Sequence, residues 1–238
     1  SFKENLVARG IDKNKIAVVM NGVDTGRYGS RPRDPDLEDR WRLGDKFVVG
    51  YVGTHGMAHG LENVLAAAEM LRGDDEIRFL MVGAGSEREL LIQSAKKRGL
   101  ENVVFAAAQP KENMPAVWSL CDLALVHLKD SPVFAGVIPS KIFEAMASGV
   151  AILLSAPSGE ASRIVLGEGA GLHVPAGDPE ALARAVQKLK KDDALRESLA
   201  KAGLCAAAGH SREAQARHML GVLAMAAQGH GDEVSHGG

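Results

Sequence analysis

Ser140 and Lys141 are the adjacent residues whose types and position could bind an anion. They lie near the start of residues 139–149, between two short apolar segments, 123–128 and 150–154, that are typical of buried strands. A helix is therefore expected over 139–149. Free amides and the helix dipole at its start would favour an anion, and Lys141 would add a positive charge. The pair predicts a phosphate site.

Glu144 follows Lys141 by three residues, so both side chains would lie on one helix face, about a turn apart. A carboxylate there can accept hydrogen bonds from sugar hydroxyls. A second interpretation needs no ligand: Ser140 caps a surface helix, Gly149 ends it in the left-handed conformation, and the Lys/Glu pair is solvated. The residues alone leave both interpretations open.

Strands and helices alternate from residue 46 onward, with little chain between them. This pattern predicts an α/β fold, a Rossmann-like, doubly wound parallel sheet covered on both faces. Strands are expected at 47–52, 77–82, 103–107, 123–128 and 150–154, with an edge strand at 171–174. Besides the helix over 139–149, helices are expected at 61–71, 87–98, 114–120, 179–191, 194–207 and 212–227.

The N-terminal part reads differently from the rest of the chain. It predicts a helix over 2–9, a strand over 16–20, a turn at 21–24, a polar linker over 30–35 and a short helix over 37–43. We therefore expect an interdomain segment and linker at 1–35, one domain at 36–228, and a disordered tail at 229–238. The missing initiator methionine suggests a fragment of a longer protein.

Two glycine-bearing loops follow the first two strands of the sheet: Gly53-Thr54-His55-Gly56 and Gly83-Ala84-Gly85-Ser86. Ligands bind outside the carboxyl ends of parallel strands, and glycine lets backbone amides approach them. Neither loop has the spacing of a Walker A or dinucleotide motif. Tight packing of strand against helix explains the second loop almost as well. We expect both loops to surround one crevice with Ser140 and Lys141.

Composition excludes several classes of function. With 28 basic and 30 acidic residues and 4% aromatic residues, the chain favours neither nucleic acid nor anionic lipid as a partner. No segment approaches the roughly 20 apolar residues that span a membrane. The distant cysteines Cys121 and Cys205 are typical of reduced cytosolic thiols. His55 and His59 lack a third ligand nearby, so no metal site is predicted.

In this order, the loops and turns resemble family 4 glycosyltransferases, retaining nucleotide-sugar enzymes of GT-B fold. The resemblance covers nearly the whole chain, through residues 20–24, Gly53, 83–85, 139–149 and 171–183. The tripeptide Pro-Ser-Lys at 139–141 makes the chain most similar to transferases that build bacterial surface polysaccharides. The resemblance implies the C-terminal, donor-binding half of the GT-B fold, with UDP-sugar as the favoured donor.

The resemblance also implies a role for individual residues. Glu144 would hold the donor ribose. The diphosphate would be bound by Ser140, Lys141, Gly53, Thr54, Gly56 and His59. The base would meet Gly83, Gly85, Gln109, Pro110 and Met114, and the sugar would meet Gly136, Val137 and Ile138. No catalytic residue is assigned.

Three positions depart from the family pattern. Gly136 stands where many members have a glutamate that contacts the sugar, and Thr54 and His59 stand where many have an arginine and a lysine on the diphosphate. Fewer cations leave more of the phosphate charge to Lys141 and backbone amides. His59 could share that role only when protonated, and its unperturbed pKa is near 6.5.

The resemblance further implies an acceptor domain that this chain lacks, which would hold a sugar or lipid-linked acceptor. We therefore expect donor binding without sugar transfer by the chain alone, no metal or other cofactor, and exposed apolar surface that favours self-association. A cytoplasmic location is expected, peripheral at the inner membrane for the full-length enzyme. The alternatives are a nucleotide-binding regulatory α/β module and a GT-B sugar epimerase.

Overall fold

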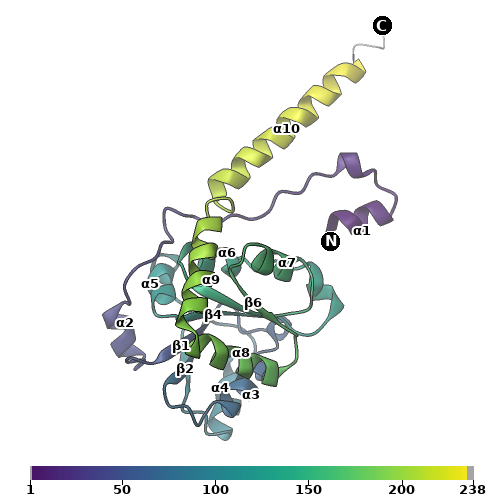
Figure 1. The fold of residues 1–238 in the computed structure, drawn as a ribbon. Coiled ribbons are helices and arrows are strands. Elements are labelled where there is room, and N and C mark those ends of the chain that lie inside the picture. The colour runs from purple at the N-terminus through teal and green to yellow at the C-terminus, as the bar shows by residue number, and fades with distance from the viewer. Residues whose placement is uncertain (1, 235–238) are drawn as a thin grey trace.

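A six-stranded parallel sheet forms the centre of the molecule in a computed structural model, which describes residues 2–234 (Figure 1). The strands are β1 (Phe47–Val52), β2 (Ile77–Val82), β3 (Val103–Ala106), β4 (Leu123–His127), β5 (Ala151–Ser155) and β6 (Gly171–Val174). Their order is β3-β2-β1-β4-β5-β6, and all neighbours are parallel. The predicted fold class and the edge position of β6 are confirmed. The strand order reverses between β1 and β4, where ligands bind in such sheets.

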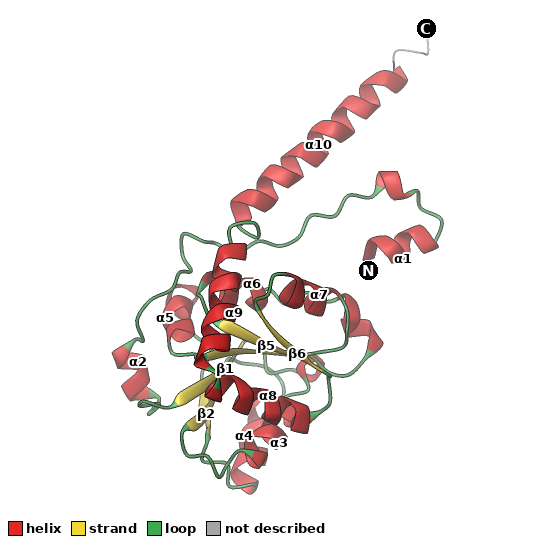
Figure 2. Ribbon diagram, viewed as in Figure 1, coloured by secondary structure: helices red, strands yellow, loops and turns green. Residues whose placement is uncertain are grey.

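Helices cover both faces of the sheet (Figure 2). One face packs against α5 (Met114–Ser119), α6 (Lys141–Ala147) and α7 (Glu160–Gly167). The other packs against α3 (Glu62–Met70), α4 (Arg88–Lys97) and α8 (Pro179–Lys191), with α9 (Asp193–Ala206) following. Successive strand residues alternate between the two hydrophobic cores, as the strand period of two requires.

Helix α7 was not among the predicted helices. Strands β5 and β6 are parallel neighbours, so the chain between them must cross over a face of the sheet, and α7 makes that crossover. Its side chains Ala161 and Val165 are buried in the core. A crossover argument from the two predicted strands would have found this helix.

The N-terminal region differs from the prediction in two ways. After helix α1 (Phe2–Ala8), residues 16–20 form no strand because no neighbouring strand pairs with them. Helix α2 (Pro35–Arg40) begins earlier than expected. Its start is set by Pro35 and by the Asp34 carboxylate, which accepts a hydrogen bond from the amide of Leu37 at 3.0 Å.

Helix α10 (Arg212–Val234) projects away from the sheet (Figure 1). Residues 229–234 are helical where the sequence predicts a disordered tail, because no proline interrupts a helix that is already formed. Residues 235–238 lie outside the described residues. Four apolar side chains of α10 are exposed: Met219, Leu220, Leu223 and Met225. The expected self-association stays a prediction.

The N-terminal segment pairs in parallel, at one position, with the residue just before α10. The amide of Val23 donates to the carbonyl of His210 at 2.9 Å, and the amide of Arg212 donates to the carbonyl of Val23 at 2.8 Å. A side chain at Gly22 would lie 2.7 Å from the backbone of Ser211, so glycine permits this close approach. We call this pairing of Val23 with Ser211 the crossing point.

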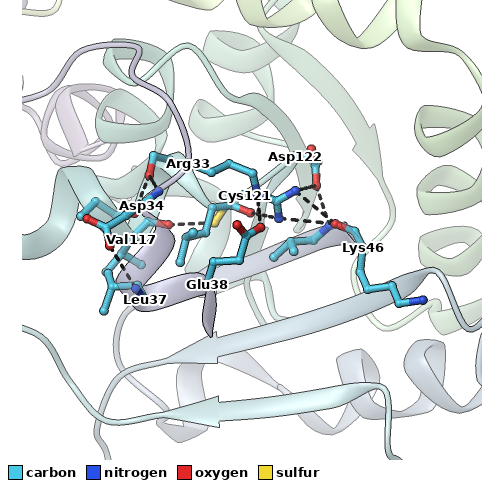
Figure 3. Close-up of polar contacts among 12 residues, drawn as sticks. Arg33, Asp34, Leu37, Glu38, Lys46, Val117, Cys121 and Asp122 are labelled. Carbon is cyan, nitrogen blue, oxygen red and sulfur yellow. Dashed lines mark hydrogen bonds and ion pairs between the residues drawn. The ribbon is translucent and has the colours of Figure 1, made fainter. Parts of the chain in front are cut away.

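Arg33 fastens the linker to the opposite, amino-terminal ends of the strands (Figure 3). Its guanidinium donates hydrogen bonds to the carbonyls of Lys46 and Leu120, the latter at 3.0 Å. It also forms ion pairs with Glu38 at 3.1 Å and with Asp122 at 3.8 Å. These contacts of Arg33 hold the predicted linker against the domain.

Among the described helices, none combines the length and apolar character needed to cross a bilayer.

Candidate functional site

A cleft of about 900 Å³ opens at the carboxyl ends of the first three strands, beside the start of α6. Nine residues with predicted site roles line it: Gly53, Thr54, His59, Gly83, Gln109, Met114, Ser140, Lys141 and Glu144. The predicted crevice therefore exists, and it brings together residues from three strand ends and α6. The individual ligand roles of these residues stay predictions.

Six predicted site residues do not line the cleft: Gly56, Gly85, Pro110, Gly136, Val137 and Ile138. A side chain at Gly85 would lie 2.3 Å from the carbonyl oxygen of His55, so this glycine is needed for the packing of two loops. The turn of 3₁₀ helix over Pro132–Gly136 packs against the start of α7, where a side chain at Gly159 would lie 2.0 Å from the carbonyl of Ala135. For Gly85, the glycine of the loop at 83–86 is therefore explained by tight packing and not by a ligand.

Lys141 lies at the floor of the cleft. Its ammonium nitrogen is 3.9 Å from the centre of the Tyr51 ring, and a side chain at Gly53 would come within 2.7 Å of it. The side chain is buried, and its nitrogen has no hydrogen-bond partner. Burial lowers the pKa of Lys141 to about 7, against the opposing effect of the Glu144 charge. The floor thus holds an amino group that is about half protonated at pH 7 and has no hydrogen-bond partner.

The predicted cap at Ser140 is wrong. Ser140 already has helical backbone angles, φ −58° and ψ −28°, and its side chain makes no capping hydrogen bond. An N-cap residue accepts from the amides ahead of it only when its own backbone is extended. The other end agrees with the prediction, because Gly149 ends α6 at φ +68°. Ser140 remains exposed at the edge of the cleft.

Three histidines surround the floor, and burial lowers the pKa of each. His55 is fully buried between the rings of Tyr51 and Phe105, with a pKa of about 4. His127, which the sequence did not single out, hydrogen-bonds the carbonyl of His59 and also has a pKa of about 4. His59 contacts the carbonyl of His127 at 3.3 Å. Burial therefore favours the neutral form of all three rings.

Glu144 lies one turn above Lys141 at the rim. It accepts a hydrogen bond from the indole nitrogen of buried Trp118 at 3.4 Å. Tyr28, which sequence reasoning missed, also lines the cleft. Burial first, and then the Glu144 charge, raises the pKa of Tyr28 to about 12. The only sequence feature near Tyr28 was the predicted turn at 21–24, and it did not indicate that Tyr28 would line the same cleft as α6.

Charged residues from the linker and α10 complete the rim. Asp24 lies 3.8 Å from Arg27 and 4.0 Å from Arg212, and all three line the cleft. Among the described residues, no group of three or more His, Cys, Asp or Glu side chains could hold a metal ion. The cleft therefore offers cationic side chains, the hydroxyls of Thr54 and Ser140, and two carboxylates, a set that suits a phosphorylated, hydroxyl-bearing ligand.

The sequence profile of the family described as glycosyl transferases group 1 matches residues 34–204, which is well over half of the chain. The chain belongs to this family. As a group 1 glycosyltransferase, it is 28% identical over 242 residues to a D-inositol 3-phosphate glycosyltransferase of Salinispora arenicola, covering 94% of this chain and 52% of that protein. It is 31% identical over 153 residues to WcaI of Escherichia coli K12, provisionally named as a colanic acid biosynthesis glycosyl transferase.

The WcaI match covers 63% of this chain and 37% of that protein. This glycosyltransferase chain therefore spans about half or less of the length of these two relatives. The crystal structure of Anabaena Alr3699/HepE in complex with UDP superposes with a TM-score of 0.82 at 21% identity, covering 94% of this chain and 61% of that one. The C-terminal domain of a group 1 glycosyl transferase, LpcC of Francisella tularensis, gives 0.67 at 21% identity, with 80% and 100% covered. The fold is the C-terminal half of GT-B.

Proposed function

We propose that this chain binds the nucleoside diphosphate sugar donor of a retaining glycosyltransferase, with UDP-sugar favoured. The transferase would pass a hexose to an acceptor during polysaccharide or glycolipid synthesis. The observation that carries the proposal is Lys141, a buried ammonium without an anionic partner at the floor of a cleft. A buried cation is costly until a counter-charge meets it, and a diphosphate would supply one.

The other cleft residues fit this donor by their chemistry. Glu144 can accept hydrogen bonds from ribose hydroxyls, and Thr54 and Ser140 can donate to phosphate oxygens beside Lys141. Gln109 and Met114 lie beyond the end of β3, where the base would reach. The name of HepE's complex with UDP supports uridine as the base for the related fold.

During transfer, the bond from the anomeric carbon to the diphosphate oxygen would break and leave its electron pair on that oxygen. The acceptor hydroxyl oxygen would bond to the anomeric carbon and lose its proton to the departing diphosphate. Lys141 and oriented amides would stabilise that developing charge. The acceptor, a sugar or a lipid-linked sugar, would be held by the part of the relatives that this chain does not match. We therefore propose that the chain alone binds the donor but transfers no sugar. Turnover by the chain alone at the rate of the whole enzyme would refute this.

Two further parts of the proposal rest on the resemblance. The reaction would need no metal or other cofactor, so EDTA should leave donor affinity unchanged. The enzyme would work in the cytoplasm, at the inner membrane when its acceptor is lipid-linked. Activity that requires added Mg²⁺ would contradict the first of these parts.

Calorimetric titration of the chain with UDP, GDP, ADP and UDP-N-acetylglucosamine tests the donor site. We expect one nucleoside diphosphate to bind, and Glu144→Ala to weaken it by about 1 to 3 kcal/mol through loss of charge-assisted hydrogen bonds. A sugar moiety should change the affinity. Affinity that ignores the sugar would favour the regulatory nucleotide-binding module, and no binding by any nucleotide would refute the donor site.

A further inference from the structure

Tyr51 is a buried residue that contacts two groups of the cleft. It is the next-to-last residue of β1, and its side chain is fully buried. The Nζ atom of Lys141 lies over the Tyr51 ring, 3.9 Å from its centre, which is within the range of a cation–π interaction. The Tyr51 hydroxyl donates a hydrogen bond to the carbonyl of Thr54 at 2.7 Å. Tyr51 therefore joins the amine at the floor to the loop that follows β1, although it does not line the cleft itself.

The ring is the contact that holds the Lys141 nitrogen from below. Among the described residues, none gives that nitrogen a hydrogen bond. Gly53 is close to it as well, because a side chain there would lie 2.7 Å from Nζ and 3.1 Å from Cε of Lys141. Gly53 lines the cleft. The nitrogen therefore lies against the ring and next to backbone that would face a ligand.

The surroundings of Tyr51 fix the orientation of its ring. The ring belongs to the hydrophobic core that α3, α4 and α8 cover. The rings of His55 and His59 lie 5.7 Å and 6.0 Å from it, centre to centre. Because the ring cannot turn without disturbing these contacts, its face stays toward the Lys141 nitrogen.

We infer that Tyr51 is a positioning residue for the donor diphosphate: the face of its ring holds the Lys141 nitrogen at the cleft floor and favours its ammonium form before a nucleotide binds. The inference rests on the proposed donor function and deepens it. The negative face of an aromatic ring attracts a cation, and the attraction is stronger where water is excluded. Because a diphosphate pairs with the ammonium and not with the neutral amine, this attraction favours donor binding.

The dependence on pH separates this role from simple packing. The ionisable groups around the Lys141 nitrogen include Glu144 on the same helix, His55 and His59 in the loop after β1, and His127 on β4. Burial lowers the pKa of all three histidines, so above pH 7 Lys141 is the basic group among them that titrates. A ring that attracts the ammonium less should lower the pKa of Lys141 further. The resulting loss of UDP affinity should be small at low pH and grow as the pH rises.

The test weakens the negative face of the ring and keeps its shape, in the whole 238-residue chain. Tyr51→Phe removes the hydroxyl and keeps the ring. Tyr51→3,4,5-trifluorophenylalanine differs from that variant only by fluorines, which withdraw electron density from the ring. In calorimetric titration, the fluorinated variant should bind UDP at most about twofold more weakly than Tyr51→Phe at pH 6, and about three- to tenfold more weakly at pH 8.5. Tyr51→Phe should keep the pH dependence of the wild type.

Phe79→3,4,5-trifluorophenylalanine is the matched control. Phe79 is also a fully buried ring, on the neighbouring strand β2 and in the same hydrophobic core, and it does not line the cleft. Fluorination there should change UDP affinity by the same factor at both pH values. A loss in the Tyr51 variant that is equal at pH 6 and pH 8.5, or a control that shows the same dependence on pH, would overturn the inference.

A ligand-free measurement tests the contact itself. Carbon-13 NMR of labelled lysine, assigned through Lys141→Met, follows the protonation of Lys141. Its titration midpoint should be about 0.5 to 1 pH unit lower in the fluorinated Tyr51 variant than in Tyr51→Phe, and equal midpoints would refute the contact. If wild type binds UDP but the two variants differ equally at all pH values, this inference falls while donor binding stands. If wild type binds no nucleotide, the proposed function falls as well.

Discussion

The floor and the rim of the cleft each contain an ionisable residue of helix α6, but only the residue at the rim has a hydrogen-bond partner. At the floor, Lys141 is buried against Tyr51 with no partner for its nitrogen. At the rim, one turn along α6, the Glu144 carboxylate accepts a hydrogen bond from Trp118. The floor keeps an amino group without a hydrogen-bond partner, while the rim keeps a carboxylate that already has one. For the proposed donor, we therefore expect the floor to supply the larger share of the driving force for binding and the rim to supply selectivity.

The largest effect is expected at the floor. Lys141→Met should weaken UDP binding by about 30- to 100-fold through loss of a charge-assisted hydrogen bond. The same change should raise the free energy of unfolding by about 1 to 3 kcal/mol, because an unpartnered polar group is removed. Calorimetry and urea unfolding measure the two effects.

Lys190→Met is the matched control for that substitution. Lys190 lies outside the cleft and pairs with Asp74 at 2.7 Å and Glu76 at 2.8 Å. Its removal should not raise stability and should leave UDP affinity unchanged. If Lys141→Met instead destabilises the protein and leaves UDP affinity intact, the comparison between floor and rim fails.

The second effect is on pH dependence. The pKa of Lys141 is about 7 in the folded chain, against 10.5 for an unperturbed lysine. Between these values the unfolded state binds more protons, so the contribution of Lys141 to stability rises with pH. UDP affinity should do the opposite, because the anion binds the ammonium form: it should fall by up to about tenfold per pH unit above pH 7.

Titrations from pH 6.5 to 9 measure this dependence. Below that window, protonation of His55 and His127 would lower stability, because burial holds the pKa of each at about 4. Lys141→Met should flatten both profiles. Wild-type UDP affinity that does not change from pH 7 to 9 would show that the ammonium does not meet the diphosphate.

A smaller effect is expected from the charged residues of the rim. The Arg212 side chain is 63% exposed and lies 4.0 Å from Asp24. Arg212→Ala should weaken UDP binding only about two- to threefold, and the difference should disappear at high salt, as for other solvent-exposed charges. A salt-independent loss comparable to that of Lys141→Met would put the main phosphate contact at the rim.

The smallest effect on the cleft is expected from α10. Replacing exposed Leu220 and Leu223 with glutamate should reduce any self-association seen by sedimentation, because the apolar stripe is interrupted. UDP affinity should stay within a factor of about two, since neither residue lines the cleft. A wild-type chain that is monomeric at high concentration would contradict the self-association.

Local patterns predicted the parts of this molecule that depend on local physics. The apolar runs gave the strands, and the glycine at 149 gave the end of α6. Lys141 was predicted to lie at the site because its helix follows a buried strand, and ligands bind outside the carboxyl ends of parallel strands. The sequence showed only that both loops contain glycines. Glycines allow the close approach of a ligand as well as that of a neighbouring loop, so the contact between the two loops could not be predicted.

The rest depends on contacts between distant segments. Tyr28 lines the same cleft as Glu144, 116 positions later in the sequence, only because the N-terminal segment lies against the domain. The unpartnered state of Lys141 depends on the packing of Tyr51 and the histidines. Reasoning from a single sequence cannot predict contacts between residues that lie so far apart along the chain. It therefore found the residues at the floor and missed Tyr28 at the rim.

The crossing point has a mechanical consequence for anything attached to this domain. A single tether would let an attached body swivel about the chain axis. Here Val23 joins two backbone segments through its hydrogen bonds to His210 and Arg212. A body attached through both segments would have two covalent connections held together at this point, which would restrict rotation about either one.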